Sequence, residues 1–156
     1  VEWHMIGHLQ TNKVKYIIDK VDLIHSLDRL SLAEELQARV KKPVNVLVQV
    51  NVSGEESKFG IEPAAATSFI RQVAQDYPLI KIKGLMTVAP FVDDPEETRP
   101  VFRGLRDLAA EIAALAIPGV EMTELSMGMT NDYLVAIEEG ATMVRIGTAI
   151  FGPRPR

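Results

Sequence analysis

The chain has 156 residues, of which 47% are hydrophobic and 24% charged, and its formal net charge is −4. These proportions are ordinary for a globular domain with a buried core, and they exclude the disordered and collagen-like classes. The acidic balance argues against a general nucleic-acid-binding face, and the absence of cysteine excludes disulfides, thiolate catalysis and cysteine-ligated metals.

Short apolar stretches alternate with helical patterns along the whole chain. The clearest predicted strand is 43–52, a continuous β-branched run of the kind found where both faces of a sheet are buried. The helix predicted at 62–78 has a proline near its first turn and another just past its end. In chain order the predicted strands are 3–9, 21–28, 43–52, 80–90, 120–128 and 143–146, and the predicted helices are 11–20, 29–42, 62–78, 94–115 and 130–140.

This alternation predicts an α/β fold of about six β-then-α units around a parallel sheet with right-handed crossovers. The sheet closes either as an open doubly wound sheet or as a TIM-type (β/α) barrel. A complete eight-unit barrel usually needs roughly 200 residues or more, so this chain is short of one by two units. Because the sequence begins within a strand-like segment and without Met, we expect the natural protein to be longer.

Polar residues gather where the predicted strands end, which is the face where parallel β/α folds bind ligands. The hydroxyl of Ser126 and the backbone N–H groups of Gly128, Gly147 and Thr148 predict a phosphate pocket. The alternative is that these glycines serve only strand-to-loop turns.

Arg145 lies inside an apolar strand, two residues before Gly147 and on the same face of that strand. A buried arginine is costly unless an anionic or hydrogen-bonding group meets it. Two alternatives follow: Arg145 points into a barrel near the phosphate, or it forms an interior ion pair with Glu124 or Glu121.

The three histidines of the chain, His4, His8 and His25, form no helical i, i+4 pair, because His4 and His8 fall in a predicted strand. This argues against a metal site. His4 and His8 have the same parity along the strand predicted at 3–9. That parity would turn both rings inward.

Five stretches together resemble the pyridoxal phosphate homeostasis protein family, in order and over essentially the whole chain. They are IGHLQTNK (6–13), VNVSGEESKFG (50–60), GLMTVAP (84–90), ELSMGMTNDY (124–133) and VRIGTAIFGPR (144–154). The resemblance implies a TIM-type barrel similar to the barrel domain of alanine racemase, with about six of its eight βα units present. Residues 1–156 would then be a single incomplete barrel domain that lacks the first two units.

The resemblance further implies a cytoplasmic, non-catalytic protein that binds pyridoxal 5′-phosphate (PLP) and takes part in PLP homeostasis. A PLP-dependent racemase-like enzyme and a phosphate-binding isomerase barrel are the alternatives. The expected partner is PLP, with neither nucleic acid nor membrane. We expect the full-length protein to be a monomer and this chain to self-associate through its open barrel edges.

Carried over by position, the resemblance places the PLP phosphate beside Ser126, Gly147 and Thr148, and the pyridine nitrogen opposite Arg145. An arginine at that nitrogen keeps it unprotonated and weakens the ring as an electron sink. Met86 and Thr87 would lie near the ring, and the mouth would be lined by Asn51, Lys58 and His8. The implied cofactor-binding set is Ser126, Gly128, Arg145, Gly147, Thr148, Met86, Asn51 and His8, with no catalytic and no metal-binding residue.

The family holds PLP through a Schiff base on a lysine at the end of the first barrel strand. We expect that lysine to lie outside this chain. Lys13 and Lys58 are the lysines nearest the predicted site, and we expect both to be surface or rim charges.

Overall fold

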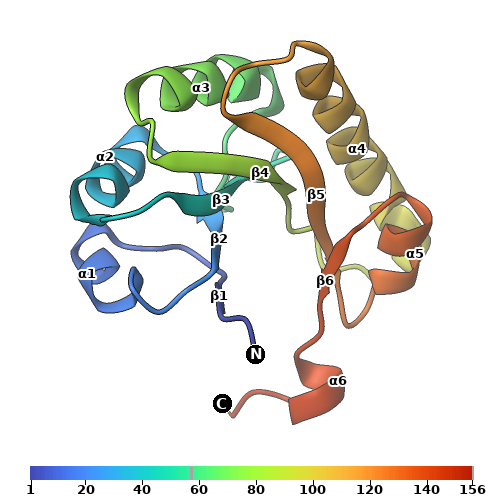
Figure 1. The fold of residues 1–156 in the computed structure, drawn as a ribbon. Coiled ribbons are helices and arrows are strands. Elements are labelled where there is room, and N and C mark those ends of the chain that lie inside the picture. Colours follow the sequence, from blue (N-terminus) through green and yellow to red (C-terminus); the bar gives the residue numbers. More distant parts are fainter. Residues whose placement is uncertain (57, 156) are drawn as a thin grey trace.

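The computed structural model describes residues 1–56 and 58–155. Its six strands form one parallel sheet in which strands adjacent in sequence are also adjacent in space. The sheet curls into an open half-barrel with β1 at one end and β6 at the other, which confirms the predicted barrel-type fold (Figure 1). The strands are β1 His4–Met5, β2 Leu23–Leu27, β3 Val44–Gln49, β4 Ile80–Met86, β5 Val120–Met129 and β6 Met143–Arg145.

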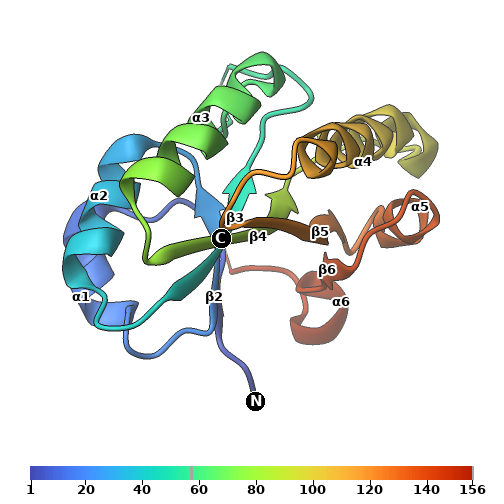
Figure 2. The same cartoon turned by 45° about the horizontal axis from the view of Figure 1, so that its top comes forward.

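Helices cover the outer side of the curled sheet (Figures 1 and 2). The longest, α4, buries one stripe of apolar side chains at helical spacing, with Phe102, Leu105, Ala109 and Ile112 facing the sheet. The helices are η1 Thr11–Lys13, α1 Val14–Ile17, α2 Leu30–Arg39, α3 Pro63–Asp76, η2 Pro95–Thr98, α4 Arg99–Ala114, α5 Tyr133–Glu138 and α6 Thr148–Phe151.

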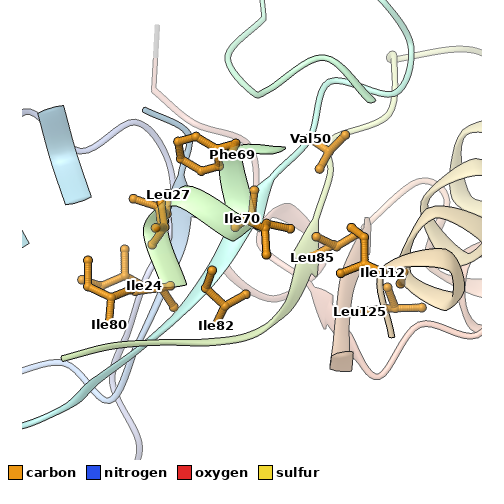
Figure 3. Packing of buried hydrophobic residues seen from close by; sticks show 14 of the residues in the cluster. Ile24, Leu27, Val50, Phe69, Ile70, Ile80, Ile82, Leu85, Ile112 and Leu125 are labelled. Carbon is orange, nitrogen blue, oxygen red and sulfur yellow. The ribbon is translucent and has the colours of Figure 1, made fainter. Parts of the chain in front are cut away.

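The main hydrophobic core lies between the sheet and these helices. Figure 3 shows its centre, where Phe69 and Ile70 of α3 pack over residues of β2 and β4 such as Leu27 and Ile82. Because side chains alternate along a strand, the alternate valines of β3 are buried on this outer face. The fold is therefore held mainly by its outer layer, which leaves the inner face of the sheet available for other groups.

A second, smaller apolar cluster forms around Leu23, Leu47 and Met86, with Val88 and Met143 packed against it. Leu47 stands between Val46 and Val48, which belong to the main core, so this cluster occupies the opposite, inner face of the sheet. The polar residues of the interior lie on the same inner face as this cluster.

The first strand is shorter than predicted. It covers only His4–Met5, because Gly7 adopts a positive φ of 86° that ends the extended ladder. The expectation that His4 and His8 share one face of a long strand is therefore wrong. His4 lies half-buried against the interior, whereas the exposed ring of His8 stacks on Phe59 with centroids 4.1 Å apart.

Strands β4 and β5 approach each other closely at Gly84. A Cβ atom on this residue would lie 1.8 Å from the carbonyl oxygen of Glu124. Glycine is needed at this position by the spacing of the two strands, which carry Met86 and Ser126 in register two residues further on.

Helix α5 is tied to α4 by a charged cluster. The buried carboxylate of Glu139, just after α5, accepts hydrogen bonds from Arg99, Arg103 and Arg106 of α4 at 2.9–3.2 Å. These hydrogen bonds hold the pKa of Glu139 below its usual value. The cluster fixes where the chain turns into β6.

None of the helices in the described part of the chain has both the length and the apolar character needed to cross a lipid bilayer.

Candidate functional site

The inner face of the half-barrel brings together three polar side chains from distant strands. His25 lies two residues after Leu23 on β2, and Arg145 lies two residues after Met143 on β6, so both share the inner face with these apolar residues. Ser126 of β5 lies between them. Its Oγ atom accepts a 2.7 Å hydrogen bond from Nη1 of Arg145 and lies 2.8 Å from Nδ1 of His25.

The guanidinium of Arg145 is held by neutral acceptors. Nη1 donates to Ser126, and Nη2 donates at 2.8 Å to the backbone carbonyl of Thr87, at the end of β4. Burial lowers the pKa of Arg145 to about 10, and the charge of Asp132 acts in the opposite direction. The side chain is therefore still a cation at neutral pH, placed in a partly dehydrated interior.

The alternative of an interior ion pair is not what the structure contains. Glu124 accepts a 2.6 Å hydrogen bond from Thr142, and Glu121 pairs with Lys83 at 3.2 Å. Among residues 1–56 and 58–155, no carboxylate forms an ion pair with Arg145. The guanidinium has two neutral partners, and its Nε has no hydrogen-bond partner in this described part of the chain.

His25 is buried beside this cation. Burial lowers the pKa of His25 to about 4, and electrostatic interactions with His4 and Arg145 shift it in the same direction. The ring is therefore neutral at physiological pH. Its Nε2 lies 3.0 Å from Nδ1 of His4, so one face of the interior carries a continuous row of polar groups from β1 to β6.

A cavity of about 590 Å³ opens at the carboxyl ends of β4, β5 and β6. Its walls come from the loops that follow these three strands, including Val88–Val92, Met129–Asp132 and Gly147–Thr148, with Lys58 at its edge. This is the face on which parallel β/α folds bind ligands, and the volume suits a small cofactor.

Gly147 and Thr148 lie in the wall of this cavity, as the phosphate prediction requires. A Cβ atom on Gly147 would have no heavy atom within 4 Å, so no part of the fold packs against this position. Its φ of −116° is open to any residue. The structure thus gives no packing or backbone reason for glycine at 147, although it has room for a ligand there.

Gly128 differs in this respect. A Cβ there would lie 2.6 Å from the Cβ of Ala136 and 3.1 Å from the Cα of Tyr133, and its φ is 99°. The close approach of α5 to β5 therefore requires glycine independently of any ligand. Ser126 is fully buried and contacts Arg145.

The remaining predicted residues surround the site at different depths. Met86 is buried in the inner apolar cluster, and the hydroxyl of Thr87 donates to the carbonyl of Val50 at 2.7 Å. Asn51 holds its own loop, donating to the carbonyl of Glu55 at 2.7 Å. Lys58 donates to the carbonyl of Ala89 at 3.1 Å and pairs with Glu55 at 3.2 Å, a rim position as expected.

Reasoning from the sequence missed His25 as part of the site. The only signal was its place two residues after Leu23 in a strand, which predicts an interior position but no partner. No three histidine, aspartate or glutamate side chains gather as a potential metal site within the described residues.

Comparison with protein families places residues 2–155 in the family described as alanine racemase, N-terminal domain. The pyridoxal phosphate homeostasis protein of Aquifex aeolicus is 51% identical over 157 residues, covering 99% of this chain and 68% of that protein. The chain spans about two thirds of the length of the curated relatives it matches.

Solved structures give the same result. PipY of Synechococcus elongatus, in a structure with PLP bound, has a TM-score of 0.85 and 35% identity, covering 97% of this chain and 71% of that one. An alanine racemase from Clostridium difficile matches with a TM-score of 0.77, 15% identity, and coverage of 100% of this chain and 41% of that one, a likeness of fold alone.

Proposed function

This chain belongs to the pyridoxal phosphate homeostasis protein family, and from that premise we propose that it binds PLP at the carboxyl ends of β4 to β6. Binding would serve PLP homeostasis without catalytic turnover. The relative from Aquifex aeolicus is named for this role, and PipY has a structure with PLP bound.

The guanidinium of Arg145 carries the proposal. Its two Nη atoms are fixed by Ser126 and Thr87, and Nε is the guanidinium nitrogen left without a partner in the described chain. A partly buried cation with a fixed orientation and a remaining donor suits an uncharged aromatic nitrogen or an anionic oxygen. We assign the pyridine nitrogen of PLP to this donor.

The phosphate of PLP fits the other half of the site. The space beside Gly147 is open, and Gly147 and Thr148 line the cavity next to Thr130. Backbone N–H groups and hydroxyls are the usual partners of a phosphate where no side chain blocks the approach. In this assignment Ser126 supports the ring end of PLP through Arg145, and Gly128 keeps α5 close to β5.

The residues present fit PLP at its ring nitrogen and its phosphate. When bound, PLP supplies an electrophilic aldehyde and an electron-withdrawing ring. The chain itself supplies a cation and an open backbone turn. It also supplies apolar side chains, of which Val88 lines the cavity and packs against the buried inner cluster that contains Met86. Met86, Asn51 and His8 do not line this cavity and remain proposed neighbours of the ligand, and His8 is the most exposed of the three.

The experiment is a titration of the 156-residue chain with PLP, followed by equilibrium dialysis and by the absorption spectrum of the cofactor. We expect saturable binding of one PLP per chain, weakened by inorganic phosphate as a competitor. Pyridoxal, which lacks the phosphate, should bind at least tenfold more weakly, because it loses the contacts at Gly147 and Thr148.

Binding that does not saturate, or equal affinity for pyridoxal and PLP, would contradict the proposal. A matched control is Arg71→Lys, which changes an exposed arginine of α3 far from the site. This variant should bind PLP as the unaltered chain does.

A further inference from the structure

A row of four side chains crosses the interior of the half-barrel. Nη1 of Arg145 lies 2.7 Å from Oγ of Ser126, and Nδ1 of His25 lies 2.8 Å from the same oxygen. Nε2 of His25 then lies 3.0 Å from Nδ1 of His4. His4 Nε2 ends the row 3.6 Å from a carboxylate oxygen of Glu2.

The chemistry of these atoms fixes the direction of the row. Arginine can only donate, so the Ser126 oxygen accepts from Arg145 and its own proton is left to donate. The one acceptor within reach in the described chain is Nδ1 of His25. His25 must then carry its proton on Nε2 and donate it to Nδ1 of His4, whose Nε2–H faces Glu2.

The opposite order is unfavourable. If His25 carried its proton on Nδ1, Ser126 would accept from both neighbours, and its buried hydroxyl would have no acceptor among the described residues. A buried donor without a partner is costly. Only the first order lets Ser126, His25 and His4 each act as both donor and acceptor.

We propose that His25 is the positioning residue of the cofactor site: through Ser126 it fixes the guanidinium of Arg145 so that Nε faces the ligand, and His4 fixes the tautomer of His25. The inference rests on the proposed assignment of Arg145 to the ring nitrogen of PLP. It adds two residues, His25 and His4, that do not line the cavity themselves.

The surroundings of His25 support a neutral, orienting role. Its charged or titratable neighbours are His4 from β1 and Arg145 from β6, and both disfavour a positive charge on His25. Ser126, from β5, supplies a neutral contact. His25 is almost wholly buried, so its orientation is set by these partners and not by solvent.

The first test needs no cofactor. Nitrogen NMR of the histidine rings in the ligand-free 156-residue chain should show His25 at neutral pH with its proton on Nε2 and none on Nδ1. The Nε–H of Arg145 should appear as a single, slowly exchanging signal. A His25 ring protonated on Nδ1, or an averaged Arg145 signal, would overturn the inference.

The second test uses a matched pair of variants. The side-chain amide of His25→Asn reaches the position of Nδ1 and can accept from Ser126, whereas that of His25→Gln reaches the position of Nε2 and meets only His4. We expect PLP affinity within about twofold of the unaltered chain for His25→Asn and a loss of about tenfold for His25→Gln. Their melting temperatures separate this effect from a general loss of stability.

Equal PLP affinity in the two variants at similar melting temperatures would refute the positioning role. Should both variants fail to fold, Ser126→Ala is the replacement, because it removes the link while leaving both histidines. It is expected to blur the Arg145 Nε signal, and a sharp, unshifted signal would count against the inference. If the unaltered chain bound no PLP, the proposed function would fail, while the ring NMR would still test the row of hydrogen bonds.

Discussion

The hydroxyl oxygen of Ser126 lies 2.7 Å from Nη1 of Arg145, although the two residues are on different strands and 19 positions apart. This contact joins β5 to β6 on the inner face of the sheet, just below the cavity at the strand ends. It means that the cation of the site is held by the barrel and not by a ligand. A cofactor would thus meet an arginine that is already oriented, which lowers the entropic cost of binding.

Arg145→Lys tests the fixed guanidinium. Lysine keeps the charge but cannot donate in two fixed directions, so one of the contacts to Ser126 and Thr87 is lost. We expect a loss of about 1–2 kcal/mol in the free energy of unfolding, measured with urea. PLP affinity should fall by about tenfold, because the Nε donor is also gone. An unchanged absorption spectrum and affinity of bound PLP would contradict the assignment of Arg145 to the ring nitrogen.

Gly147→Ala separates binding from folding. Because the added Cβ meets no atom of the fold within 4 Å, the free energy of unfolding should stay within about 0.5 kcal/mol of the unaltered value. The methyl group would stand where the phosphate approaches, and PLP affinity should fall by about tenfold or more. Thermal melting and PLP titration on the same sample measure both. A variant that binds PLP normally would show that this turn is not the phosphate site.

Gly84→Ala, in contrast, should lower the stability of the fold and have no specific effect on PLP binding. Its Cβ would lie 1.8 Å from the carbonyl oxygen of Glu124, so β4 and β5 must move apart. Overpacking of this kind costs about 1–3 kcal/mol or more, and urea unfolding should show at least that loss. Any loss of PLP binding should follow the fraction unfolded. A variant as stable as the unaltered chain would mean that the two strands are not this close.

The order of strands and helices could be predicted from the sequence because local residue patterns determine these elements. The run at 43–52 is rich in β-branched valine, and most of it forms β3 within a parallel sheet. The segment 3–9 was predicted less well, because its apolar pattern says nothing about the positive φ of Gly7 that ends β1 after Met5.

The site was predictable only in part, for a reason of distance along the chain. Arg145 and Gly147 lie two residues apart and therefore on one strand face, because side chains alternate between the two faces of a strand. The contact between His25 and Ser126 spans 101 positions and joins β2 to β5, which are not neighbours in the sheet. It exists because the sheet curls, and no local pattern encodes the extent of that curl.

The buried neutral ring of His25 predicts a dependence of stability on pH. The pKa of His25 is about 4 in the folded chain and about 6.5 in the unfolded one, so the unfolded state binds more protons between these values. Stability is therefore full above pH 6.5 and is lost as pH falls towards 4. The loss from pH 7 to pH 5 should be roughly 2 kcal/mol.

Urea unfolding at pH 5, 6 and 7 measures this slope, and His25→Asn is the control that removes it. His4 and His8 are present in both chains, and the carboxylates with lowered pKa, Glu96 and Glu139, contribute mainly at more acidic pH. The same slope in both chains would show that His25 is not the group responsible.

The two ends of the half-barrel predict self-association of this chain. Strand β1 pairs only with β2, and β6 pairs only with β5, so each presents an edge with unpaired backbone groups. Trp3 lies beside the first edge and Ile150 follows the second, and both are exposed apolar side chains. We expect light scattering over a concentration series to show dimers or larger species.

Ile150→Lys should weaken this association by about tenfold or more, since burying an isoleucine contributes about 1.5–3 kcal/mol. Leu115→Lys, at an exposed apolar residue just after α4 and away from both edges, is the matched control and should have no effect. A monomer at every concentration, or equal effects of the two lysines, would mean that these edges do not recruit a second chain.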